Sequence, residues 1–238
     1  MTNINLYLSR LISSNTSRFM FIFILLLSFL ILSCTTSNQP LEAIANENET
    51  LPYFNTPDWT PKWIEKTDSQ YQNIHRIPKF KLKDQEGEMI SNKTVEGKIY
   101  IANFFFTSCR GICPKMTSNM YLLQDAFQQD TTILFLSHSV TPESDSVAIL
   151  KKYAIENKVN SKQWHLLTGA KKDIYDLAKK QYFAGDTIGY YQTGNEFLHT
   201  ENFILVDQQK RIRGVYNGTL LVEIERIKED IAILKKEH

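Results

Sequence analysis

Two cysteines directly follow a long apolar run, and this arrangement limits what the chain can fold into. The run covers residues 99–106, Cys109 and Cys113 come next, and Pro114 follows at once. This order predicts a buried strand, a short loop and a helix with proline in its first turn, where a missing N–H is tolerated. Both sulfurs are then expected near a helix N-terminus, where the dipole and free N–H groups favour thiolate over thiol. Such a pair can close into a disulfide or hold a soft metal ion.

Composition sets broad limits on the class of protein. The chain has 238 residues, of which 42% are hydrophobic and 22% charged, with a formal net charge of +1. These values fit one globular domain with extensions. Because the charge is near neutral and no basic stripe occurs, there is no electrostatic case for a nucleic-acid partner.

The N-terminus resembles a lipoprotein signal peptide over residues 1–33. Arg10 and Arg18 precede an apolar segment, residues 19–32, that is shorter than the ~20 residues of a spanning helix. The segment ends in Ile-Leu-Ser-Cys, which is similar to a bacterial lipobox with Cys34 as the lipidated residue. An uncleaved anchor helix is the alternative. In both cases we expect a membrane-tethered protein of a bacterial cell envelope that faces the periplasm, on the inner or the outer membrane.

The remaining chain divides into a tether and a domain. Residues 34–76 are rich in Asn, Thr, Glu and Pro, which is typical of a flexible tether, although the tryptophans of residues 57–63 also suit an arm packed on the domain. The folded domain is expected over residues 77–238. With Cys34 used by the anchor, Cys109 and Cys113 are the two cysteines left, in a compartment where an idle pair would be oxidised.

The domain pattern alternates strands with helices. The elements that we expect are a β-hairpin over 80–90, strands over 99–106, 132–137 and 164–168, a hairpin over 203–216, and helices starting near Pro114, Pro142, Lys171 and Leu220. Residues 184–197 predict an exposed loop inserted before the second hairpin. This order implies an α/β fold, a central mixed sheet flanked by helices. A cysteine pair between the first core strand and its helix is where a thioredoxin-like fold carries its chemistry.

Local patterns predict how two of the helices begin and pack. Leu122, Leu123 and Phe127 give the first helix an apolar face at helical spacing. Thr141 is the expected N-cap of the second helix, with proline at its first position. Met116 and Met120 could offer thioether ligands, but methionine at such spacing more often fills a core.

Two thiolates leave a metal ion under-coordinated, so one of the five histidines is expected to supply a third ligand. His75 in the arm and His238 at the terminus are not expected to be fixed by the fold, and His165 reads as a satisfied histidine in an apolar strand. His138 ends a strand on the cysteine side and is a weaker candidate. His199 is the best placed, at the mouth of the long loop before a strand that passes beside the cysteine loop in a thioredoxin-like layout. Imidazole plus two thiolates suits copper.

Four segments, residues 105–114, 139–146, 164–169 and 199–207, resemble the Sco/SenC family. The spacing C-x-x-x-C-P with a downstream histidine is quite specific, since an ordinary thioredoxin has C-x-x-C. The similarity covers the chain from about Pro78 to the C-terminus. Thr141 departs from the family pattern, which often has aspartate before this proline.

The resemblance implies a thioredoxin-like fold and a function. The family binds one copper ion through two cysteines and a histidine, here Cys109, Cys113 and His199, and helps to assemble the copper centre of cytochrome c oxidase. The implied partners are the copper-bearing oxidase subunit, a copper donor and a thiol reductant. We therefore expect a membrane-tethered metallochaperone, which is not an enzyme. The alternative is an extracytoplasmic thiol-disulfide oxidoreductase that uses Cys109 and Cys113 as its catalytic pair, and a third interpretation is an inert structural disulfide.

Overall fold

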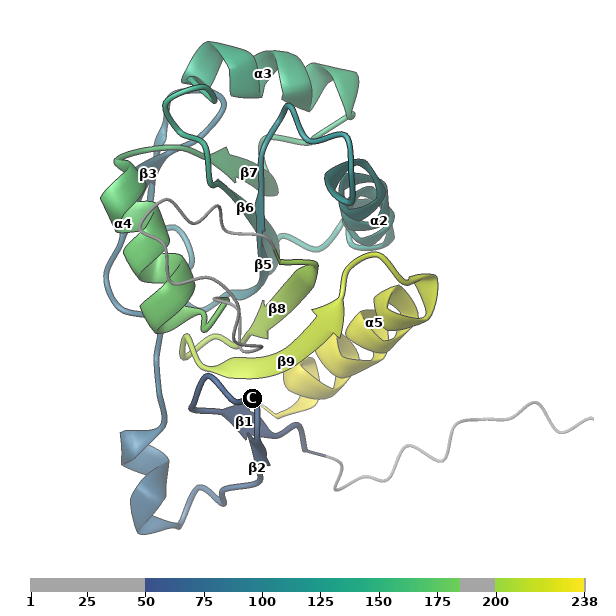
Figure 1. The fold of residues 1–238 in the computed structure, drawn as a ribbon. Helices are drawn as coiled ribbons and strands as arrows, with labels where there is room; N and C mark the ends of the chain where they lie inside the picture. Colours follow the sequence, from purple (N-terminus) through teal and green to yellow (C-terminus); the bar gives the residue numbers. More distant parts are fainter. Residues whose placement is uncertain (1–49, 185–199, 238) are drawn as a thin grey trace, which may run out of the picture. The chain divides into compact units, whose positions relative to one another are not determined.

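A five-stranded mixed sheet forms the centre of the fold in the computed structural model, which describes residues 50–184 and 200–237 (Figure 1). The strand order is β7-β6-β5-β8-β9. Within this sheet β5, β6 and β7 are parallel, and β8 and β9 are antiparallel to their neighbours. The strands are β5 (Ile99–Phe105), β6 (Ile133–Ser139), β7 (Trp164–Leu167), β8 (Asn202–Val206) and β9 (Ile212–Asn217). The predicted thioredoxin-like α/β fold is confirmed.

Strand β5 is central and buried along its whole length. Its side chains alternate between two hydrophobic clusters: Ile101 and Phe105 pack on one face of the sheet, while Tyr100 and Phe104 pack on the other. Because both faces are covered, the strand reads in the sequence as a continuous apolar run and not as an alternation.

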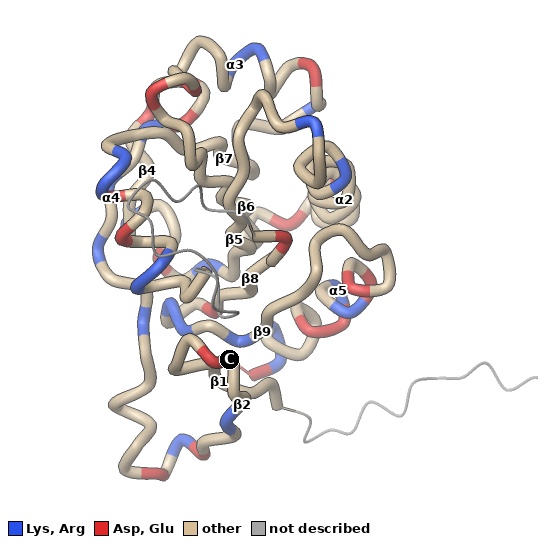
Figure 2. Tube along the Cα trace, in the orientation of Figure 1, with Lys and Arg blue, Asp and Glu red and all other residues tan. Residues whose placement is uncertain are grey.

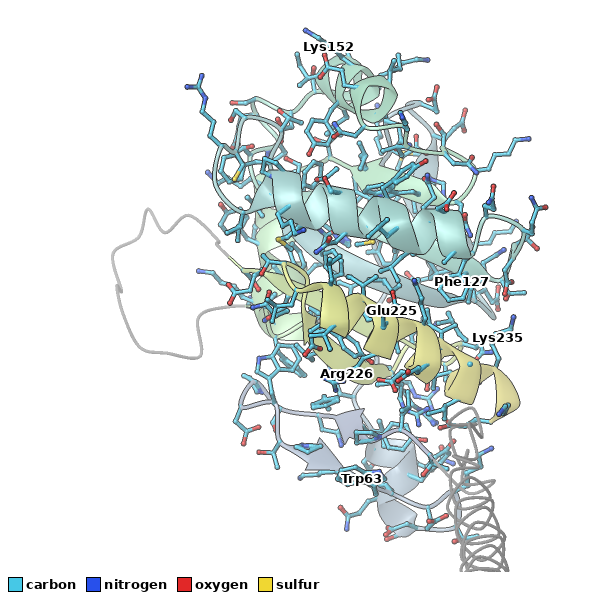
Figure 3. The ribbon with its side chains drawn as sticks, turned by 90° about the vertical axis from the view of Figure 1, so that its right-hand side faces the viewer. Trp63, Phe127, Lys152, Glu225, Arg226 and Lys235 are labelled. Atoms are coloured by element: carbon cyan, nitrogen blue, oxygen red, sulfur yellow. The ribbon has the colours of Figure 1, made fainter. Side chains whose placement is uncertain are left out.

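Helices cover the two faces unequally. The cluster that contains Phe105 also takes residues from α2 (Cys113–Ala126), α3 (Val147–Glu156) and α5 (Leu221–Lys236). Figure 3 shows α2 and α5 lying side by side on this face. The other face is covered by α4 (Lys171–Asp176), the π-helical turn η2 (Leu177–Gln181) and the predicted hairpin, whose strands are β3 (Lys81–Lys83) and β4 (Met89–Ser91).

Two local predictions about the helices were wrong. In the predicted apolar face of α2, Leu123 is buried and Phe127 packs on the same cluster, but Leu122 is 42% exposed. Met116 and Met120 are core residues, as expected. Helix α3 begins at Val147 with Ser146 as its N-cap. Thr141 does not cap it, because its hydroxyl donates to the Asp145 carboxylate and the chain turns between these two residues.

Residues 50–76 form an arm that packs against the start of β9. The arm contains β1 (Tyr53–Phe54), paired with β2 (Pro61–Lys62), and the 3₁₀ helix η1 (Ser69–Asn73). The buried guanidinium of Arg213 donates to the Leu51 and Pro52 carbonyl oxygens and lies 4.2 Å from the centre of the Tyr53 ring. Its charge is balanced by Asp207 and Glu237. Residues 50–76, which lie inside the segment that we assigned to the tether, therefore pack on the domain.

The surface charges of the described residues are mixed. Figure 2 shows acidic and basic residues interspersed along the trace, and none of the helices described is long and apolar enough to cross a membrane.

His138 is buried on the α4 side of the sheet. Its ring stacks on Phe104 at 5.0 Å between centroids, its Nδ1 lies 3.3 Å from the Asn103 carbonyl oxygen, and its Nε2 is buried without a hydrogen-bond partner. Burial lowers the pKa of His138 to about 4, because removing the ring from water disfavours the charged form.

This histidine should make the protein acid-sensitive, and His138→Leu should remove that sensitivity. The unfolded chain takes up the proton near pH 6.5 and the folded chain only near pH 4. The contribution of neutral His138 to the free energy of unfolding is therefore fully present above pH 6.5, and about 3 kcal/mol of it is lost as the pH falls to 4. Urea unfolding at pH 7, 5.5 and 4 measures this loss. Parallel losses in the parent and in His138→Leu would contradict the assignment.

Candidate metal centre

The loop between β5 and α2 carries both cysteines at the carboxyl end of the central strand. The Cys109 N–H donates to the Phe106 carbonyl oxygen at 3.3 Å, which closes a turn, and α2 then begins at Cys113 with Pro114 next. Proline fits this first turn because its missing N–H has no partner there anyway. Both cysteines are free thiols, Cys113 buried and Cys109 partly exposed.

The sulfur of Cys109 is surrounded by hydrogen-bond donors. Partial burial raises the pKa of this thiol, but hydrogen bonds from the Cys113 thiol and from the backbone N–H groups of Cys113, Gly111 and Ile112 outweigh it, so that its pKa lies below the ordinary value. These N–H groups belong to the loop and to the first turn of α2, where they have no helical partner. The prediction of an activated thiolate therefore holds for Cys109.

The same prediction was wrong for Cys113. Desolvation, together with the hydrogen bond to Cys109, raises its pKa to about 12. The side chain is only 5% exposed and lies in the apolar cluster beneath α2. A helix N-terminus favours a thiolate, but here the loss of water around the sulfur is the larger effect.

A buried carboxylate ties the loop to the next strand. Asp145, 1% exposed, accepts hydrogen bonds from the Thr107 hydroxyl at 2.6 Å and the Thr107 N–H at 3.2 Å. It also accepts from the hydroxyl groups of Ser139 at 2.6 Å and Thr141 at 3.0 Å. Thr107 lies two residues before Cys109, so the carboxylate joins the start of the cysteine loop to the end of β6.

The loop borders a shallow pocket of about 400 Å³. Its lining consists of Phe106, Ser108, Cys109, Arg110, Gly111 and Ile112. Cys109 is therefore accessible from solvent, whereas Cys113 is buried and does not line the pocket. Within residues 50–184 and 200–237, no group of three or more His, Cys, Asp or Glu side chains could hold a metal ion.

Comparison with known proteins decides the family. A model of the family SCO1/SenC matches residues 68–235. The chain belongs to the SCO1/SenC family. Among curated proteins it is 28% identical over 159 residues to the SCO1 protein homolog of Bacillus subtilis, covering 66% of this chain and 81% of the relative. A protein of Stutzerimonas stutzeri whose name proposes copper binding is 27% identical over 153 residues, covering 62% and 72%.

Solved structures of this family share the fold. A SCO1/SenC family lipoprotein from Bacillus anthracis is 29% identical with a TM-score of 0.59, covering 68% of this chain and 95% of that one. BsSco is 27% identical with a TM-score of 0.56, covering 68% and 94%. It is described as a member of the Sco family of cytochrome c oxidase assembly proteins, with a disulfide switch.

The structure describes the contacts of three of the histidines of this SCO1/SenC protein. His138 packs with Phe104 and Tyr182, on the face of the sheet away from Cys113. His165 binds Asp84 at 3.0 Å, as expected of a satisfied histidine. His75 was predicted to be unfixed, which is wrong: its Nε2 lies 2.8 Å from the Gln181 carbonyl oxygen and its ring contacts Phe183.

Three predicted positions lie outside the described residues: the ligand His199, the lipidation site Cys34 and the terminal His238. The structure therefore brings together Cys109 and Cys113, and the third ligand remains a prediction.

Sequence reasoning missed Asp145 and Thr107. Asp145 stood in a segment quoted for the family resemblance, but no role was given to it. The available signal was the grouping of hydroxyl residues around one carboxylate, at the ends of two neighbouring parallel strands. Tyr153 of α3 was missed as well: its hydroxyl pairs with Thr117 at 2.8 Å and its ring packs on Phe105.

The two thiols should differ in reactivity. With limiting iodoacetamide at pH 7.5, Cys109 should be alkylated at least tenfold faster than Cys113, because it is more exposed and has the lower pKa. Peptide mass spectrometry of the reduced protein measures the two rates. Cys113→Ser and Cys109→Ser, each with one thiol of the pair left, serve as controls. Equal rates in the parent protein would show that the two environments are not as described.

Proposed function

We propose that this protein is a membrane-tethered copper metallochaperone that helps to assemble the copper centre of a respiratory cytochrome oxidase. The observation that carries the proposal is the cysteine pair itself: two reduced thiols, hydrogen-bonded to each other, with Cys109 open to a solvent-facing pocket. Two adjacent soft sulfur donors fit Cu(I), whereas carboxylate and carbonyl oxygens suit hard cations. Copper is the cargo in this proposal, and the pair must be reduced to take it up.

His199 is proposed as the third ligand because of where the chain returns to the sheet. Ala102 of β5 pairs with Ile204 of β8 in antiparallel register. The start of β8 at Asn202 therefore lies level with Phe104, at the end of β5 from which the cysteine loop leaves. Thr200, the first residue described after the gap, comes two positions earlier, and its hydroxyl accepts from the Asn202 N–H. His199 is its direct neighbour in the sequence.

Relatives support both the cargo and the recipient. The name of the Stutzerimonas stutzeri relative proposes copper binding, and BsSco belongs to a family of cytochrome c oxidase assembly proteins. We propose the copper-bearing oxidase subunit as recipient, with a copper donor and a thiol reductant as further partners.

The tether is proposed from the N-terminal sequence. The lipobox-like residues 31–34 support lipidation of Cys34, and the similar structure from Bacillus anthracis is that of a lipoprotein. We propose that the domain lies on the periplasmic side of a bacterial membrane.

Copper stoichiometry tests the main proposal. The reduced protein, loaded anaerobically with Cu(I) and dialysed against a competing chelator, should retain one copper per chain. Cys109→Ser and Cys113→Ser should retain none, and His199→Ala should bind at least tenfold more weakly. His75→Gln is the matched control, since it removes an imidazole from the arm and should not change affinity. No tight copper in protein with two free thiols would overturn the proposal.

The second candidate function is a thiol-disulfide oxidoreductase, which the unequal thiols favour. The exposed, low-pKa Cys109 suits the attacking thiol, and the buried Cys113 suits the resolving thiol. Reduction of a model disulfide that needs Cys109 but is indifferent to His199→Ala, in protein without tight copper, would favour this function over the first.

Lipidation has a direct test. Cys34→Ser should move the protein from the membrane fraction to the soluble fraction or leave it uncleaved, and the parent protein should carry lipid on its N-terminal residue by mass spectrometry. An unmodified Cys34 in membrane-bound parent protein would support the anchor helix instead.

A further inference from the structure

We propose that Asp145 is a positioning residue that holds Cys109 against Cys113 through Thr107. This deepens the proposed function, and it applies equally to metal binding and to disulfide exchange, because both need two sulfurs at a fixed separation. Nothing in the sequence patterns assigned a role to this aspartate.

The contacts of Asp145 fall into two groups. Both polar groups of Thr107 that can donate do so, the hydroxyl to Oδ1 at 2.6 Å and the N–H to Oδ2 at 3.2 Å. On the other side, Oδ2 accepts from the Ser139 and Thr141 hydroxyl groups. The carboxylate thus bridges the cysteine loop and the segment that follows β6, and each of its oxygens has a partner.

The bridge is rigid on the side away from the cysteines. Ser139 pairs with Phe105 in the parallel ladder, and the Val140 N–H donates to the Phe105 carbonyl oxygen at 2.9 Å. The Asp145 N–H donates to the Thr141 carbonyl oxygen at 2.8 Å, and Ser146 then caps α3. Asp145 is therefore fixed by β6 and α3, and its bonds to Thr107 restrain the start of the cysteine loop.

Thr107 is well placed to transmit this restraint. It follows β5 by two residues and precedes Cys109 by two, and the Cys109 N–H closes a turn on Phe106 next to it. Beyond Cys109 the loop is exposed at Arg110, Gly111 and Ile112 until Cys113 enters the core. Since Cys113 is held by α2, the position of Cys109 relative to it depends on the start of the loop.

Restraint of this kind raises the effective concentration of one thiol at the other. The reaction that measures it is the exchange of the protein dithiol with oxidised glutathione. The Cys109–Cys113 disulfide forms, the disulfide of glutathione breaks, and two molecules of reduced glutathione carry away the electrons and protons. The equilibrium constant of this exchange reports the geometry of the pair in the folded protein without any metal.

A merely structural role for Asp145 predicts a different result. If the carboxylate only joined β6 to α3, losing a hydrogen bond on either side would lower stability and leave the exchange constant unchanged. The chain offers a matched pair of variants for this distinction. Thr107→Val removes the 2.6 Å bond on the cysteine side, and Ser139→Ala removes the 2.6 Å bond on the other side.

The experiment titrates the parent, Thr107→Val, Ser139→Ala and Asp145→Asn against glutathione redox buffers, on full-length protein confirmed as folded by circular dichroism. Thr107→Val should lower the exchange constant about tenfold, a shift of about 30 mV toward a more oxidising pair. Asp145→Asn should lower it by at least as much, and Ser139→Ala should stay within twofold of the parent despite a similar loss of thermal stability.

Equal shifts in Thr107→Val and Ser139→Ala, or an unchanged or higher constant in Thr107→Val, would overturn the proposal. Cu(I) affinity measured on the same variants should fall in the same order. If the parent binds no copper, the metallochaperone function fails while the exchange constants still decide the role of Asp145.

Discussion

The structure depends on β5, a strand buried on both faces and hydrogen-bonded on both edges. A parallel neighbour lies on one side and an antiparallel neighbour on the other, so the strand cannot shift without disturbing both hydrophobic clusters. Its carboxyl end is consequently held firmly in place. The cysteine loop leaves from this end and returns into α2, which packs back over the same strand. The site is thus built on a rigid element at both of its ends.

The chemistry of the site comes from a difference between its two sulfurs. They are four positions apart in the sequence, yet one lies among backbone N–H groups in a solvent-facing pocket and the other among methionine, leucine and aromatic side chains. The buried thiol acts as a donor to the exposed one, which makes the two titrations dependent on each other. A pair arranged in this way is open to a partner at one sulfur only. That geometry suits metal transfer and disulfide exchange equally, which explains why one scaffold supports both candidate functions.

Much of this could be predicted from the sequence because it follows from local pattern. The strand before Cys109, the turn before α2 and the order of strands and helices all depend on runs of residues with clear periodicity. The failures concern long-range effects. Leu122 fits an apolar helical face, but the packing of α2 against α5 and the sheet determines which face is buried. Thr141-Pro142 looks like a helix start, but a carboxylate four residues later takes the threonine hydroxyl. The helix position of Cys113 predicted a lowered pKa. Its burial depends on the whole hydrophobic cluster and raises the pKa instead.

The arm is a further case in which long-range contacts could not be predicted from the sequence. Its composition resembles a tether, but contacts with residues far along the chain hold it in place, among them the buried Arg213, Gln181 and Phe183. Arg213 stands near the start of β9, and Ile212 is level with Val206, which pairs with Tyr100 at the start of β5. The arm therefore docks near the end of the sheet opposite the cysteine loop. Because the arm docks away from the cysteine loop, it contributes nothing to the lining of the pocket at Cys109 and leaves that thiol uncovered.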